Sequence, residues 1–210
     1  MQAPEHTQTA PDPLARDTRL ALDLALTIRH DGHGGVADDL AAPAGLTIWV
    51  RAHQDALPGA AAFQADADDL AAVRHLRAAV RALFAHAVRP AAPSPADAAR
   101  LLPLPEALSR LNTAAARTPT VPVLTWPDAG DPMLDHRPTT TPPDLTATLA
   151  QAMIAFLAGP DRRRLRACHA PRCVRYFLKD HPRQEWCRPS CGNRARVARH
   201  HERHKKPTAM

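Results

Sequence analysis

Aromatic side chains are scarce in this sequence, at 4% of its 210 residues. Much of the apolar content, 45% in all, is alanine, so the sequence predicts a lean helical core built from leucine and alanine. No stretch of about 18 apolar residues occurs, which excludes a membrane-spanning helix. The first residues also lack the basic-then-apolar order of a secretory signal. We therefore expect a cytoplasmic protein, with one medium domain or one domain plus a small module, and no membrane partner.

The sequence also lacks the marks of a catalytic site. It contains no convergent set of Cys, His and Asp or of Ser and His, and no internal repeat. His30, Asp31 and His33 lie in a Gly-containing stretch, but its pattern is not that of a phosphate-binding loop and favours a plain connection. We therefore expect the protein not to be an enzyme.

Charge is unevenly distributed along the chain. Residues 161–210 hold 15 Lys and Arg against 4 Asp and Glu, whereas residues 1–160 hold 12 against 17. A basic segment attached to an acidic body favours binding of a polyanion, most often nucleic acid. A solvated basic tail that only aids solubility explains the charge alone equally well.

The acidic body is expected to be α+β, mainly helical with a small sheet. Alternating leucines from Leu20 to Ile28 predict a strand with one buried face. Two short apolar runs around residues 127–131 are typical of a β-hairpin. Apolar spacing predicts helices over residues 46–57, 70–87 and 145–157. Thr141 is expected to be the N-cap of the last helix, and Gly159-Pro160 ends it at a domain boundary.

All four cysteines lie inside the basic segment, in one stretch of 24 residues, at Cys168, Cys173, Cys187 and Cys191. The spacing is Cys-x4-Cys-x13-Cys-x3-Cys, and two close pairs joined by a short spacer are typical of a tetrahedral zinc site. We expect one Zn²⁺ per chain, held by four thiolates. A mixed ligand set is an alternative, drawing on His169, His181, His200 and His201. Two disulfides would fit a secreted protein, which the N-terminus does not indicate.

The spacer between the cysteine pairs is expected to form a hairpin whose strands are residues 174–180 and 185–187. Cys191 would then ligate zinc from the first turn of a terminal helix, in a treble-clef-like zinc finger. Tyr176, Phe177 and Trp186 are expected to pack around the metal, and zinc to supply most of the folding energy of so small a module. A thiolate in a closed four-ligand site is a poor nucleophile, so we expect Cys191 to be structural.

From Asn193 onward the sequence predicts a basic helix with no acid before Glu202. Arg suits phosphate and guanine edges and Lys suits phosphate, so this helix favours double-stranded DNA as the partner. Val197 and His201 are expected to face the hairpin. The candidate DNA contacts are Arg194, Arg196, Arg199, Arg203, Lys205 and Lys206. The alternative is a protein-interaction module without direct DNA binding, whose helix docks on a partner or on the acidic body.

Residues 165–204, which contain Cys191-Gly192-Asn193-Arg194, closely resemble the CGNR zinc finger. The stretches ALDLALT and LTIWVRAH and the last long helix before the finger resemble the ABATE domain, which that family joins to the finger. The resemblance implies a bacterial, stress-induced transcription regulator, with zinc on the four cysteines and DNA on the helix from Gly192.

With the boundary after Pro160, the resemblance divides the chain into four parts. These are a flexible tail (1–17), an ABATE-like α+β domain (18–160), the zinc finger (161–206) and a second tail (207–210). The N-terminal domain is expected to sense an unknown small-molecule effector or to form a homodimer. A DNA-binding regulator would be associated with the nucleoid.

Overall fold

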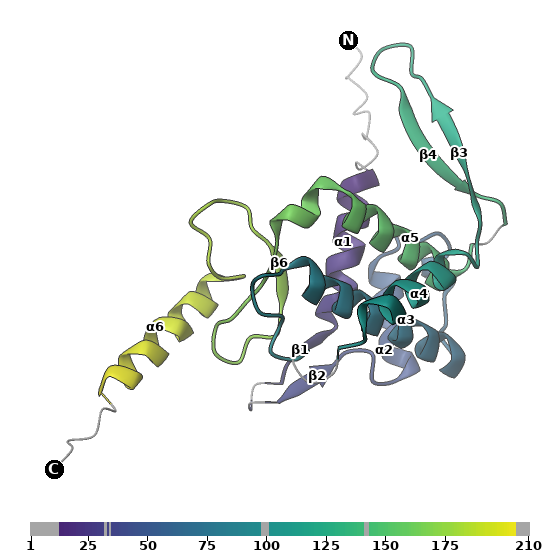
Figure 1. The fold of residues 1–210 in the computed structure, drawn as a ribbon. Helices are drawn as coiled ribbons and strands as arrows, with labels where there is room; N and C mark the ends of the chain where they lie inside the picture. The colour runs from purple at the N-terminus through teal and green to yellow at the C-terminus, as the bar shows by residue number, and fades with distance from the viewer. Residues whose placement is uncertain (1–12, 32, 34, 98–100, 141–142, 205–210) are drawn as a thin grey trace, which may run out of the picture.

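The computed structural model describes residues 13–31, 33, 35–97, 101–140 and 143–204. This part contains six α-helices, two 3-10 helices and three two-stranded antiparallel sheets (Figure 1). In chain order the elements are α1 (Pro13–Leu26), β1 (Ile28–His30), β2 (Val36–Asp38), α2 (Pro43–Ala52), η1 (Ala60–Ala62), α3 (Ala67–Ala87), α4 (Leu104–Ala115), β3 (Thr120–Thr125), β4 (Met133–Pro138), α5 (Leu145–Ala158), η2 (Pro160–Arg164), β5 (Leu165–Ala167), β6 (Tyr176–Leu178) and α6 (Pro189–His204). The expected fold class, α+β and mainly helical, is confirmed. Within these residues, no helix combines the length and apolar character that crossing a membrane requires.

The first element, α1, is a helix, so the strand expected from the alternating leucines is wrong. Leu20, Ala21, Leu24 and Ala25 are all buried and recur at helical spacing. The strand prediction considered only the alternating leucines. The alanines between them are also apolar and have the highest helix propensity, so the segment equally fits a helix. Of the segment expected as a strand, only its last residue, Ile28, is extended, as the first residue of β1, which pairs with β2.

Helix α3 confirms the helix expected over residues 70–87 and lies at the centre of the body. Asp66 and Asp69 form a capping box at its start, because each side chain accepts a hydrogen bond from the backbone N–H of the other. Val73 and Phe84 are fully buried on the face that packs toward the other helices. Helix α3 contacts α1, α2, α4 and α5, so it organises the apolar core.

Helices α2 and α5 confirm the two other expected helices, with different ends. Helix α2 ends at Ala52, earlier than the expected Leu57. The N-cap of α5 is Asp144, whose side chain accepts a hydrogen bond of 2.8 Å from the N–H of Ala147. The expected cap, Thr141, lies outside the described residues, and Gly159 ends the helix as expected.

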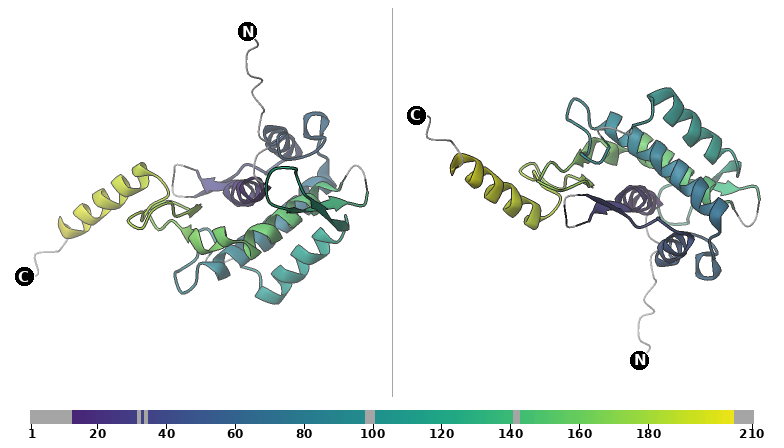
Figure 2. Two further views of the ribbon diagram at one scale, coloured as in Figure 1. Left: turned by 90° about the horizontal axis from the view of Figure 1, so that it is seen from above. Right: turned by 90° about the horizontal axis from the view of Figure 1, so that it is seen from below.

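The expected β3–β4 hairpin is confirmed, with Thr120 opposite Pro138 and Thr125 opposite Met133. It projects beyond the helices in Figure 1. At another extremity, α6 extends away from the helical body, and both views of Figure 2 show the same arrangement. The last helix therefore has most of its surface available to a partner.

Candidate metal centre

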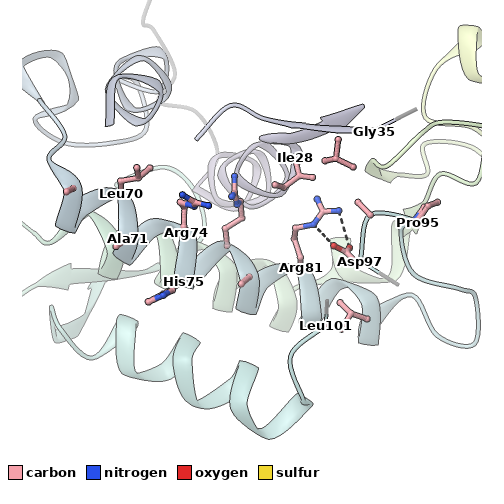
Figure 3. A pocket seen from close by; sticks show the side chains of 15 residues that line it. Ile28, Gly35, Leu70, Ala71, Arg74, His75, Arg81, Pro95, Asp97 and Leu101 are labelled. Carbon is pink, nitrogen blue, oxygen red and sulfur yellow. Dashed lines mark hydrogen bonds and ion pairs between the residues drawn. The ribbon is translucent and has the colours of Figure 1, made fainter. Parts of the chain in front are cut away.

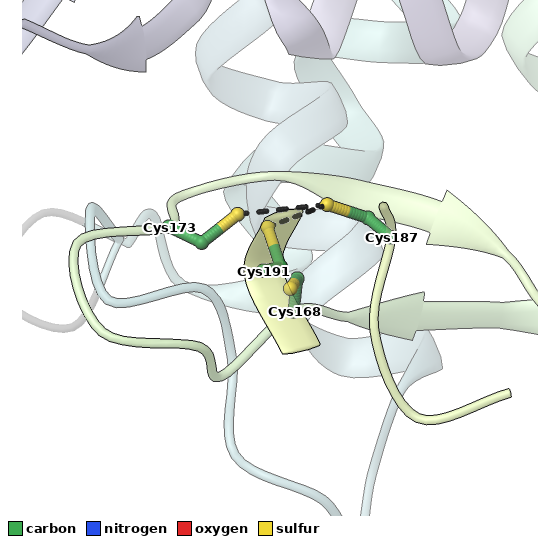
Figure 4. A group of neighbouring side chains, drawn as sticks. All are labelled: Cys168, Cys173, Cys187 and Cys191. Atoms are coloured by element: carbon green, nitrogen blue, oxygen red, sulfur yellow. Dashed lines mark hydrogen bonds between the residues drawn. The ribbon is translucent and has the colours of Figure 1, made fainter. Parts of the chain in front are cut away.

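Four segments bring the cysteines together. Cys168 follows β5, Cys173 precedes β6, Cys187 lies in the loop before α6, and Cys191 lies in the first turn of α6 (Figure 4). The two ends of the first loop are held by backbone hydrogen bonds, from Cys168 N–H to Arg175 O and from Cys173 N–H to Ala170 O, both 2.9 Å. The placement of Cys191 in the first helical turn is as the sequence predicts.

The geometry of the four thiols fits a tetrahedral metal ion. All four Sγ atoms lie within 4.8 Å of one another, and Cys187 Sγ is 3.7 Å from Cys173 Sγ and 3.5 Å from Cys191 Sγ. A tetrahedron with Zn–S bonds of about 2.3 Å has edges of about 3.8 Å, close to these distances. All four cysteines are free, which argues against the disulfide alternative. The cluster confirms the expected site for one Zn²⁺ per chain.

The alternative histidine ligands lie outside this cluster. Among the described residues, the four cysteines are the one group of three or more ligand-type side chains close enough to share an ion. The four histidines considered as alternative ligands are all exposed: His169, His181, His200 and His201. An all-sulfur set is the donor chemistry that suits zinc.

Crowding makes the ionisation of these thiols interdependent. Hydrogen bonds from Cys173 and Cys187 lower the pKa of the Cys168 thiol to about 2. The neighbouring Cys168 in turn raises the pKa of Cys173 to about 11 and raises that of Cys187 further. Like charges in so small a space oppose one another, so a full set of thiolates needs a cation, which Zn²⁺ supplies.

The strand partner inside the finger differs from the expected one. Strand β6 pairs with β5, with Leu165 opposite Leu178 and Ala167 opposite Tyr176. The segment 185–187, expected as the second strand, contains no strand. The β5–β6 hairpin therefore carries the first cysteine pair in its loop, and α6 supplies the last ligand. The hairpin expected between the two cysteine pairs does not form in the described residues.

Two of the three expected aromatic residues pack at the cysteines. Phe177 is buried beside Cys168, Cys173 and Cys191, and Trp186 packs partly buried against this small cluster. Tyr176 does not, because side chains alternate along β6 and its ring enters the core of the helical body. The ring of Tyr176 lies 5.4 Å from that of Phe84 in an edge-on arrangement.

Each residue of the Cys191-Gly192-Asn193-Arg194 segment has a contact at the start of α6. A Cβ added at Gly192 would lie 3.1 Å from Cδ1 of Trp186, so glycine lets the indole pack closely against the helix. The Asn193 side chain accepts a hydrogen bond from the Arg196 guanidinium. Arg194 donates to Cys191 Sγ at 3.0 Å and to the carbonyl oxygen of Pro171 at 3.1 Å. The segment thus supports the cysteine cluster as well as supplying one ligand.

The basic residues of α6 divide into two groups. Arg196, Arg199 and Arg203 are exposed on the helix, whereas the guanidinium of Arg194 is hydrogen-bonded beside the cysteines. Lys205 and Lys206 lie outside the described residues. Their roles, like those of the arginines, stay predictions.

The packing face of α6 is not the expected one. Val197 is 55% exposed and His201 is exposed, so the expectation that they face the hairpin is wrong. The helix instead buries Cys191, Gly192 and Ala195, which lie on the same side of its first two turns. Small residues allow the close approach to the cysteine cluster that a valine would hinder.

A buried polar network joins the finger to the body. Arg81 forms an ion pair with Asp97, with distances of 2.7 Å and 3.1 Å. Asp97 also accepts a hydrogen bond of 2.7 Å from the Tyr176 hydroxyl, and Ser94 Oγ donates to Val174 O at 2.8 Å. Burial, together with the charge of Asp97, raises the pKa of Tyr176, which therefore stays neutral.

Sequence reasoning missed this network, although one signal pointed to it. Arg81 precedes Phe84 by three positions, and Arg77 follows Val73 by four, so both arginines fall on the buried face of α3. A charged residue at such a position needs a partner. The identity of the partners, Asp97 and Tyr176, depends on tertiary structure alone.

Two family models match the chain. The ABATE model, described as "Putative stress-induced transcription regulator", matches residues 18–160, and the CGNR zinc finger model matches residues 164–204. No curated protein matches the chain. The two families are described as regulators and zinc fingers, not as enzymes.

Proposed function

The chain belongs to the ABATE family and carries a CGNR zinc finger, and we propose that it is a transcription regulator that binds double-stranded DNA through α6. The observation that carries the proposal is the anchoring of an exposed arginine-bearing helix to a four-cysteine cluster. Cys191 and Ala195 are buried at its start, so the first two turns are held while Arg196, Arg199 and Arg203 stay exposed.

The size and charge of α6 suit DNA. Its 16 residues span about 24 Å at 1.5 Å per residue, which is long enough to cross or enter a major groove. Arginine forks bind phosphate oxygens and the O6 and N7 atoms of guanine. Glu202 is the one acidic residue within the helix. An anchored helix of this composition is typical of a groove or backbone reader.

The rival reading, in which the helix docks on the acidic body of its own chain, has less support. In Figures 1 and 2 α6 points away from the body. Arg196, Arg199 and Arg203 are exposed on it. The other alternative is that α6 binds an acidic partner protein. DNA-binding experiments distinguish that alternative from the proposal. Catalysis by the metal is disfavoured, because four thiolates leave no coordination position for water.

Selection from randomised duplexes tests the proposal. The full zinc-loaded chain is incubated with the pool at a fixed salt concentration, and the enriched duplex is then titrated at several salt concentrations. We expect enrichment of a sequence, and affinity that falls with salt at a log–log slope of about −0.9 per neutralised phosphate. A matched arm uses protein stripped of zinc, which should bind weakly. Absence of binding, or a salt-independent affinity, would contradict the proposal.

A further inference from the structure

A groove lies along α3, between that helix and the β1–β2 sheet (Figure 3). At one end it reaches Pro95 and Asp97, on the segment that follows α3. Its volume is about 960 Å³, which is enough for a small organic molecule. Neither the cysteine cluster nor α6 lines it.

The walls of the groove are mostly apolar. Ile28 and Val36 come from the sheet, and Leu101 lies at the opposite side. Ala71 and Ala78 lie along α3, where small side chains leave the space that the groove occupies. Ligand pockets combine apolar walls of this kind with a small number of polar groups that orient the ligand.

Three arginines line the groove, and one of them has no carboxylate partner in the part of the chain that the structure describes. Arg77 binds both carboxylate oxygens of Asp38, at 2.5 Å and 2.7 Å, and Arg81 is held by Asp97 in the same bidentate way. The third arginine, Arg74, is exposed and has no hydrogen-bond or ion-pair acceptor among the described residues. Two of the three guanidinium groups are therefore neutralised by a paired carboxylate, and the third is not.

The charge of Arg74 also lowers the pKa of Asp38, the acid that pairs with Arg77. Burial tends to raise the pKa of Asp38, but hydrogen bonding and charge from Arg77 outweigh it, and the charge of Arg74 adds to the lowering. Asp38 thus remains ionised and paired with Arg77. The Arg74 guanidinium is left to bind an anion that enters from solvent.

We propose that this groove binds an organic monoanion with an apolar body, such as a medium-chain carboxylate, whose acid group pairs with Arg74. One free guanidinium matches a single negative charge, and the apolar walls match a hydrocarbon or ring system. The bound molecule would lie beside Asp97, which also accepts the hydrogen bond of Tyr176 and so holds the finger. Binding of an anion in this groove does not require that α6 bind DNA.

Fluorescence titration without DNA tests the proposal. The probe is 1-anilinonaphthalene-8-sulfonate, an apolar ring system with one negative charge, added to the full zinc-loaded chain. We expect saturable binding at one site per chain and displacement by decanoate. The uncharged decan-1-ol, which has the same chain length, should displace the probe at least about tenfold less well, because it cannot pair with Arg74.

Matched variants assign the binding to the groove. Arg74→Gln should weaken the probe and decanoate about tenfold, whereas Arg110→Gln, at an exposed ion pair on α4, should leave both unchanged. Ala71→Trp, at an exposed position in the groove, should block binding while the far-ultraviolet circular dichroism stays that of wild type. Equal binding by Arg74→Gln and wild type, equal displacement by decanoate and decanol, or undiminished binding to Ala71→Trp would each overturn the proposal.

Discussion

The guanidinium of Arg194 donates a hydrogen bond to Sγ of Cys191, three residues earlier on α6, at 3.0 Å. A second bond, from Arg194 Nε to the carbonyl oxygen of Pro171, ties the helix to the loop between Cys168 and Cys173. Both ligand pairs are thereby linked through one side chain. The arginine that closes the Cys191–Arg194 segment is in place to stabilise a thiolate, which is a different role from contact with DNA.

Replacement of Arg194 should therefore weaken zinc binding. Loss of a group that hydrogen-bonds a metal ligand lowers metal affinity by about 10- to 100-fold, and we expect Arg194→Ala to fall in that range. Competition with a chromogenic zinc chelator measures the change. Arg196→Ala is the matched control, because Arg196 bonds Asn193 and no cysteine. Equal zinc affinity of Arg194→Ala and wild type would contradict this role.

Removal of zinc should unfold part of the finger and spare the helical body. The residues around the cysteines depend on the metal, whereas Leu165, Ala167 and Tyr176 are buried in the body core. Amide hydrogen exchange after chelation should show protection lost in α6 and around Trp186 and retained in α3. We expect β6 to keep much of its protection, because Tyr176 still bonds Asp97. Equal loss across α3 and α6 would show that all parts share one metal-dependent core.

The Asp97 network should contribute strongly to stability. Asp97→Ala leaves Arg81 buried without its ion-pair partner, which destabilises a protein by about 3–5 kcal/mol. Tyr176→Phe removes one hydrogen bond while the ion pair stays, so we expect about 1 kcal/mol. Urea unfolding of the zinc-loaded protein gives both values. Asp135→Ala, at a carboxylate whose side chain is 60% exposed, is the control and should change stability by less than about 0.5 kcal/mol. A small effect of Asp97→Ala would show that the network is dispensable.

Stability should decrease, through His53, as the pH rises above about 6.5. Burial tends to lower the pKa of His53, but its hydrogen bonds to Asp23 at 3.1 Å and to Trp49 O at 2.8 Å raise it overall. A raised folded pKa means that the contribution is complete below the unfolded value, about 6.5, and is lost as the pH rises through the folded value. The free energy of unfolding should fall over that window in wild type and fall less in His53→Gln. Identical pH profiles for the two proteins would exclude His53 as the cause.

The sequence predicted the features that depend on local pattern. Three patterns each favour one structure: the apolar spacing of α3, the turn residues between β3 and β4, and the cysteine spacing. The alternation in α1 had two, a strand or a helix, and the alanines at two of the intervening positions, Ala21 and Ala25, favoured the helix. The N-cap of α5 also differs, because Asp144 satisfies the first turn of that helix.

The parts that the sequence did not predict depend on long-range contacts. Tyr176 belongs to the finger by position and to the body by packing, since its partners Arg81 and Asp97 are distant in sequence. Likewise, β6 pairs with β5 rather than with the segment near Trp186. The domain limits, the homodimer, the effector and the association with the nucleoid stay predictions.

The central claim is that the exposed arginines of α6 contact DNA, and the salt dependence of duplex binding tests it most directly. Arg196→Ala, Arg199→Ala and Arg203→Ala are compared with wild type and with Val197→Ala, a control at a side chain that is 55% exposed on the same helix. Each arginine that contacts a phosphate should, when replaced, reduce the log–log salt slope by about one and weaken all sequences alike. An arginine that reads a guanine should instead cost about 1–3 kcal/mol at one base position. Val197→Ala should bind as wild type does. Wild-type affinity and slope in all three arginine variants would contradict the account and favour an acidic protein partner for α6.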